Sequence, residues 1–177
     1  MANLSFGTTV AVEPVCAASV DSVDAVQNAL GAVADQGDCL WISYENSWLR
    51  HWASLLTKAY DAPGVAHLCE DFSVIQPDQV QPLAAELEGV LNEFQREPFA
   101  LLSLLIDPGD YTVEYVDDYR KQIAEVISRQ PELPHVQVYL DGRECADTLA
   151  SFLVAHLTVL RRAQAQGFAA LHAWFEN

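Results

Sequence analysis

The stretch HVQVYLDGRECADTLASFLVAHLTVLRRAQAQGFAALHAWF, residues 135–175, decides the fold. Its first six residues alternate between polar and apolar side chains, which predicts a β-strand over residues 135–140. Apolar residues then recur every three or four positions, so a long helix is expected from about Cys145 to Gln166. Gly167 can end this helix, and residues 168–175 (FAALHAWF) predict a final strand.

A similar order of elements stands near the N-terminus. Residues 8–16 (TTVAVEPVC) are rich in β-branched side chains and predict a strand, and residues 39–44 (CLWISY) predict another. A helix is expected between them, capped by Ser19 or Asp21. In each strand–helix–strand unit the crossover helix permits parallel pairing of the two flanking strands, with a right-handed connection.

The middle of the chain is expected to be mainly helical. One helix follows the second strand, another begins at Pro77, and a third covers about 112–129. Residues 72–75 are either a short strand or a loop, whereas residues 99–106 favour helix because leucine outnumbers β-branched side chains there. We therefore expect a single domain, 1–177, of α/β or α+β class, with one mixed sheet of about four or five strands and helices packed on it.

Charge is the strongest compositional feature. The chain has 9 basic and 25 acidic residues, a formal net charge of -16, and 51% of its residues are hydrophobic. Such a surface repels nucleic acids and anionic lipids and favours cationic protein partners. The alternative interpretation is that the acidity only provides solubility.

The sequence also bears on location. No apolar run is long enough to cross a bilayer, and residues 1–15 lack the basic start and apolar core of a signal peptide. We therefore expect a cytoplasmic protein. The four cysteines are widely spaced, which favours free thiols over disulfides or zinc ligands.

Acidic residues crowd one stretch, with no basic residue before Arg120 and with tyrosines between them. If residues 112–129 are helical, Glu114, Asp117 and Asp118 share one face. This face can dock Lys and Arg side chains of a partner, or its charge can simply complement the dipole at the helix N-terminus. The predicted partner-binding residues are Asp107, Asp110, Tyr111, Glu114, Tyr115, Asp117 and Asp118.

Motifs for catalysis or cofactor binding are not found in the sequence. We predict no catalytic residue, no metal and no cofactor. His67 and Cys69 are too few ligands for a zinc site. His156 and His172 occupy apolar positions and are interpreted as structural, although a Cys–His pair assembled by folding stays open.

The acidity, the order of elements and the missing catalytic motifs resemble the small immunity proteins of bacterial toxin systems. The closest local likeness is the C-terminal unit, where VQVYL, then DGRE (141–144), then a long helix and a final strand resemble the strand–DGR–helix–strand ending of one immunity family. A second stretch, IQPDQVQPLAAELEGVL (75–91), is similar to a helix start in a family of small uncharacterised bacterial proteins.

The resemblance to immunity proteins implies inhibition by tight binding. The expected partner is a basic protein, a cognate toxin effector domain, whose active-site region the acidic surface would occlude. The alternative function is a small-molecule-binding or enzymatic domain with its site at the strand ends, as in open α/β sheets.

Overall fold

A computed structural model of the chain describes residues 5–34, 41–45, 49–105, 113–129, 135–139 and 145–176. Strands and helices are both present, in agreement with the predicted mixed class, and the strands follow the order β3-β5-β1-β2-β4. The strands are β1 (Ser5–Val12), β2 (Trp41–Glu45), β3 (Phe72–Ile75), β4 (His135–Tyr139) and β5 (Ala169–Glu176).

Strand pairing differs from the prediction for the N-terminal unit. β1 pairs with β2 in antiparallel fashion, and Val10 lies opposite Trp41, so β2 begins beside the end of β1. A crossover helix allows parallel pairing but does not force it. The C-terminal unit also departs from the prediction, because β4 pairs with β2 in parallel while β5 pairs antiparallel with β1 and β3.

The antiparallel unit β3-β5-β1 is buried on both faces. Thr9 and Ala11 of β1 belong to one side, where the larger core lies, whereas Val10 and Val12 pack in a smaller cluster on the other side. Successive residues of a strand point to opposite faces, so this alternation requires a covering layer on each side.

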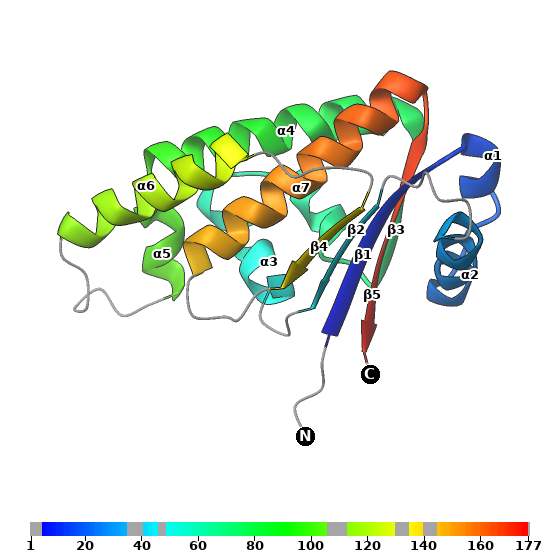
Figure 1. The fold of residues 1–177 in the computed structure, drawn as a ribbon, viewed down its shortest axis with the longest axis horizontal. Coiled ribbons are helices and arrows are strands. Elements are labelled where there is room, and N and C mark those ends of the chain that lie inside the picture. The colour runs from blue at the N-terminus through cyan, green and yellow to red at the C-terminus, as the bar shows by residue number, and fades with distance from the viewer. Residues whose placement is uncertain are drawn as a thin grey trace.

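Helices supply both layers (Figure 1). Two N-terminal helices lie on one side of the sheet, and the remaining helices lie on the other side. The N-terminal pair is α1 (Pro14–Ala17) and α2 (Val23–Ala34). The second layer holds α3 (Leu49–Ala59), the 3-10 helix η1 (Pro63–Leu68), α4 (Pro77–Arg96), α5 (Phe99–Leu105), α6 (Val113–Arg129) and α7 (Cys145–Gln166).

The helix α7 is the centre of the second layer. Six consecutive residues, 152–157, are buried, because the helix contacts the sheet on one side and α4 and α6 on the other. A helix that is apolar on most of its circumference is stable only when it is enclosed in this way. The expected inner-face residues of this helix are confirmed as buried: Leu149, Phe152, Leu153, His156, Leu157 and Leu160.

Proline and polar side chains set the starts of two helices. Pro77 is the first residue of α4, where its missing N–H costs nothing, and the side chain of Gln79 accepts a hydrogen bond from the Gln76 backbone N–H at 3.0 Å. The strand predicted to reach residue 16 ends at Val12, because Pro14 starts α1. The cap predicted at residue 19 or 21 is instead Ser22, whose hydroxyl accepts from the Ala25 N–H at 3.2 Å.

Two open points of the sequence analysis are resolved. Residues 72–75 form a strand, and residues 99–105 form a helix. Both choices agree with local composition, since the first segment contains Phe72, Val74 and Ile75, which favour strands, and the second is rich in leucine.

We predict that replacing glycine by alanine changes the free energy of unfolding in opposite directions at two positions. Gly167 ends α7 with a φ of 68°, which a β-carbon disfavours, so Gly167→Ala should lower the free energy of unfolding by about 1 kcal/mol. Gly89 lies inside α4 with open space around its Cα, so Gly89→Ala should raise that free energy by about 0.5–1 kcal/mol. Urea unfolding measures both changes in the free energy of unfolding. If the two changes had the same sign, the left-handed conformation of Gly167 at the end of α7 would be contradicted.

Candidate functional site

The helix expected to dock a partner is α6, and its predicted helical structure is confirmed from Val113 to Arg129. Ile123 is fully buried, and Val126 and Ile127 pack against the core. These apolar residues follow helical spacing and occupy one side, which leaves the opposite side to charged residues.

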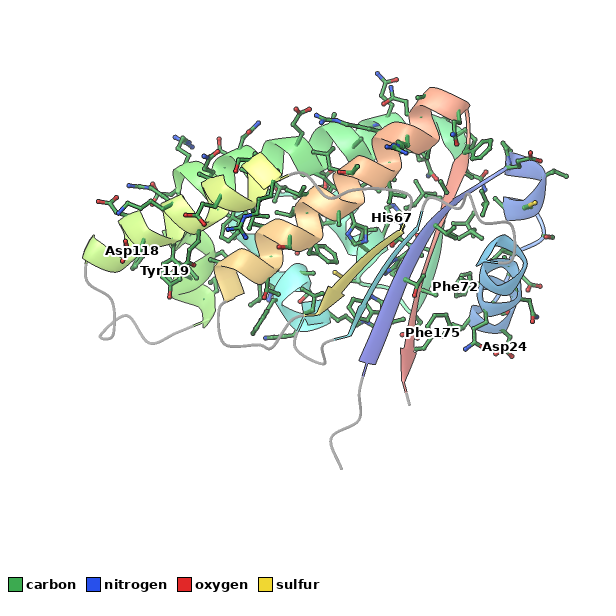
Figure 2. The ribbon with its side chains drawn as sticks, in the orientation of Figure 1. Asp24, His67, Phe72, Asp118, Tyr119 and Phe175 are labelled. Atoms are coloured by element: carbon green, nitrogen blue, oxygen red, sulfur yellow. The ribbon has the colours of Figure 1, made fainter. Side chains whose placement is uncertain are left out.

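Two of the predicted contact residues are plainly displayed on this helix. The side chains of Asp117 and Asp118 are 63% and 65% exposed. Figure 2 shows Asp118 on α6 at the opposite end of the molecule from Asp24 of α2. Glu114 and Tyr115 belong to α6 by their backbone. Three further predicted residues lie outside the described ranges: Asp107, Asp110 and Tyr111.

Both exposed aspartates pair with cations of the same helix. Arg120 contacts Asp117 at 3.1 Å, and Lys121 contacts Asp118 at 3.3 Å. The i,i+3 spacing of these pairs is visible in the sequence, and it lowers the net charge of this face below what the acidic stretch suggests. Exposed pairs of this kind contribute only about 0–1 kcal/mol, so a partner's cation could replace either intrahelical one at little cost.

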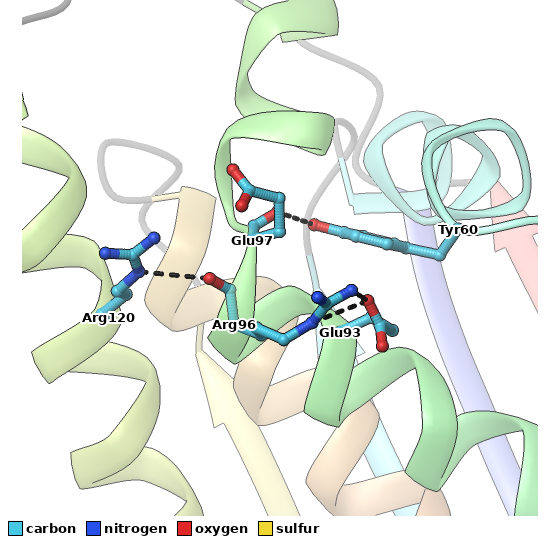
Figure 3. A network of polar contacts seen from close by, with 5 residues as sticks. All are labelled: Tyr60, Glu93, Arg96, Glu97 and Arg120. Atoms are coloured by element: carbon cyan, nitrogen blue, oxygen red, sulfur yellow. Dashed lines mark hydrogen bonds and ion pairs between the residues drawn. The ribbon is translucent and has the colours of Figure 1, made fainter.

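A second set of polar contacts holds the end of α4 against its neighbours (Figure 3). Arg120 Nε donates to the Arg96 carbonyl at 3.2 Å, and the Tyr60 hydroxyl donates to the Glu97 carbonyl at 3.0 Å. Arg96 also pairs with Glu93. Carbonyls at a helix C-terminus lack donors within the helix, so these contacts satisfy them and fix α6 relative to α4. Burial raises the pKa of the Tyr60 phenol, which keeps the donor protonated.

Deep in the larger core, two histidines meet at one threonine hydroxyl. Thr9 Oγ1 lies 2.9 Å from His156 Nε2 and 2.7 Å from His172 Nδ1. All three side chains have no exposed surface. They come from β1, α7 and β5, so the contact joins the central helix to two adjacent strands of the sheet.

The hydrogen positions in this cluster follow from its acceptors. His156 Nδ1 lies 2.9 Å from the Phe152 carbonyl, which can only accept, so this nitrogen carries the proton. The Nε2 of the neutral ring then accepts from the Thr9 hydroxyl. Thr9 has one proton, so a hydrogen bond with His172 requires that Nδ1 of that ring carry a proton. The ring of His172 also interacts with the Leu68 backbone.

Burial keeps both rings neutral. It lowers the pKa of His156 to about 4, because the charged form loses its hydration. Burial also lowers the pKa of His172 well below its ordinary value, and the neighbouring His156 adds to that effect. The cluster has the residue types of an acid–base site, but its enclosure in the core gives it a structural role, as the sequence interpretation of these histidines expected.

Arg50 connects the sheet to the segment before β3. Its Nε donates to the Cys69 carbonyl at 2.7 Å, its terminal nitrogen pairs with Asp71 at 2.7 Å, and its guanidinium lies 5.9 Å from the ring centroid of Trp174. Trp174 Nε1 in turn donates to the Leu68 carbonyl at 2.9 Å. These contacts fix the segment that carries two residues considered as ligands, His67 and Cys69.

The thiol of Cys69 is unsuited to nucleophilic chemistry. Burial raises its pKa to about 11, so the thiol stays protonated near neutral pH. His67 Nδ1 lies 3.3 Å from the Ser73 hydroxyl. Within the described part of the chain, no group of three or more His, Cys, Asp or Glu side chains is arranged to hold a metal ion.

The described residues line at least two surface grooves. The larger, about 270 Å³, lies between α4, α6 and α7. The smaller, about 230 Å³, lies between η1, the end of β3 and the start of α4, with His67, Asp78 and Glu86 among its lining residues. A β-carbon on Gly64 would come within 2.8 Å of the Glu86 carboxylate, which accepts from the Val65 N–H at 3.0 Å, so glycine allows this close approach. The smaller groove is at a strand end, where the alternative function places a site.

Comparisons with protein-family models, with curated proteins and with solved structures gave no match to this chain. The described helices include none with the length and apolar character that a membrane span requires. The site must therefore be argued from its own residues.

We predict that the Thr9 hydroxyl, rather than its volume, stabilises the core. Thr9→Val keeps the shape but leaves two buried ring nitrogens without their shared partner, so the free energy of unfolding should fall by about 2–3 kcal/mol. Thr9→Ser keeps the hydroxyl and removes one methyl, which should cost about 1 kcal/mol. Denaturant unfolding ranks the variants, and a larger loss in the serine variant would reject this role.

We also predict a pH dependence that starts from His156. Its pKa is lower in the folded chain than in the unfolded one, so the unfolded state takes up the proton first as pH falls. The contribution of neutral His156 to the free energy of unfolding is fully present above pH 6.5. It is lost between about pH 6.5 and 4, and the loss reaches about 3 kcal/mol for this one group. His156→Gln should flatten this slope, measured by urea unfolding across that range, whatever its stability at neutral pH. The matched control is His51→Gln, an exposed position on α3, which should leave the slope unchanged.

Proposed function

We propose that this protein is an intracellular inhibitor of the immunity type, which binds a basic protein and occludes its active-site region. The supporting observation is the placement of charge. No described carboxylate is buried, since the buried polar side chains are threonines, a serine and histidines. The described carboxylates are therefore at least partly exposed, and the net charge of -16 of the chain attracts cationic partners over about a Debye length.

The proposed contact surface is the outer side of α6. Asp117 and Asp118 are exposed there, and their present partners Arg120 and Lys121 belong to the same helix. A partner's guanidinium can pair with such a carboxylate in place of the intrahelical cation and exclude water from the contact. The free energy gained by this interfacial pair is larger than that lost with the exposed pair. The buried side of α6 and its contact with Arg96 hold the surface rigid before binding.

A toxin effector that acts on nucleic acids or nucleotides is the partner class that fits this surface. Such enzymes carry basic clefts for phosphate groups, and a helix bearing carboxylates can fill that cleft in place of the substrate. Binding should then be fast and sensitive to salt, because long-range attraction between opposite charges raises the association rate.

We predict that Glu114→Ser, Asp117→Ser and Asp118→Ser together weaken partner binding more than tenfold and reduce its salt sensitivity, while the fold stays intact. The tagged protein is purified from its native cells at low salt, the bound protein is identified by mass spectrometry, and its affinity is measured by calorimetry. A stoichiometric basic protein that salt releases is the expected result.

The control removes the same charge elsewhere. Glu13, Asp21 and Asp24 are exposed on the α1–α2 side, and changing all three to serine lowers the negative charge equally. This variant should keep nearly all of the affinity. If both triple variants lose affinity to the same extent, total charge and not α6 is responsible. If no basic protein is captured, the inhibitor function itself is wrong.

A further inference from the structure

The larger groove has features that a surface for a basic partner does not require. Its floor is aliphatic and belongs to three helices: Leu91 of α4, Ile127 of α6, and Val154 and Leu157 of α7. Leu91, Val154 and Leu157 keep 6–7% of their surface exposed although they belong to the main core. The groove is thus a place where the core reaches solvent between helices.

Two arginines of α7 line the same groove, in a chain with only 9 basic residues. Arg161 reaches across to α4 and pairs with Glu88 at 2.6 Å. Arg162 has no carboxylate at ion-pair distance among the described residues. With one carboxylate and two guanidinium groups, the lining carries a net positive charge within a strongly acidic molecule.

Helix stability does not account for this charge. Cations stabilise a helix through its dipole within the last turn, and the last turn of α7 has no basic residue. Arg161 has a structural partner in Glu88, whereas Arg162 lines the groove and forms no ion pair with a described carboxylate.

We propose that this groove binds a small organic monoanion, a carboxylate on an apolar body. The carboxylate would pair with Arg162, whose planar guanidinium suits two parallel hydrogen bonds, and the apolar body would cover Leu91 and Leu157. The volume of about 270 Å³ lies just below the range typical of ligand pockets, about 300–1,000 Å³, so the ligand is small. A polyanion is disfavoured because the whole molecule repels it, whereas a single negative charge meets mainly the local arginines. This inference does not depend on the proposed inhibitor function.

The test uses hexanoate, hexanamide and acetate, titrated into the full-length protein at pH 7 and followed by amide chemical shifts. Hexanoate should bind saturably with a dissociation constant in about the millimolar range and shift the amides of Asn92 and Thr158. Hexanamide lacks the charge and acetate lacks the apolar body, so each should bind about tenfold more weakly or not at all.

Two arginine variants localise the effect. Arg162→Gln should weaken hexanoate binding about tenfold, with an unchanged unfolding midpoint. Arg129→Gln removes an arginine of α6 that pairs with Glu125 and does not line the groove, so it should bind hexanoate as the wild type does. Equal binding of hexanoate and hexanamide, equal losses in both variants, or no saturable shift at Asn92 and Thr158 would each overturn the proposal.

Discussion

The hydroxyl of Thr9 is the point on which the arrangement of layers depends. It contacts residues 147 and 163 positions away in the chain and so ties α7 to β1 and β5 at once. Apolar packing alone tolerates small shifts of a helix over a sheet, whereas this contact requires both ring nitrogens at hydrogen-bond distance. Because α4 and α6 pack on the far side of α7, the position of that helix also sets the positions of α6 and of the larger groove.

Much of the fold could be predicted because its signals are local. The apolar spacing of residues 145–166 is sufficient for α7, and the left-handed Gly167 was expected to end it. The pairing of strands could not be predicted, since the register between Val10 and Trp41 depends on contacts that no short window contains. A crossover segment permits parallel pairing but sets no strand direction by itself, which is why β1 and β2 of the N-terminal unit can pair in antiparallel fashion.

The candidate site likewise has features that depend on local sequence and features that depend on contacts between distant residues. The helix of the acidic stretch and the exposure of Asp117 and Asp118 follow from an amphipathic pattern. The sequence also shows a cation three positions after each aspartate, so their intrahelical pairing could have been predicted. The prediction of a docking surface considered only the number of acidic residues. The contact between His156 and His172 could not be predicted from the sequence, because both residues occupy apolar positions, which indicate burial but not which side chains are neighbours.

Charge and burial together explain why the two proposed sites can coexist. The described core holds no carboxylate, so the described acidic residues lie on the outside, where they repel one another and other anions. An anion site on such a molecule needs local cations that their neighbours do not fully neutralise, and α7 provides Arg161 and Arg162 with no acidic residue between positions 148 and 175. On α6, by contrast, every described carboxylate has a cation one turn away. A basic partner must therefore displace weak intrahelical pairs, whereas a small anion in the groove meets Arg162, which pairs with no carboxylate of the described residues.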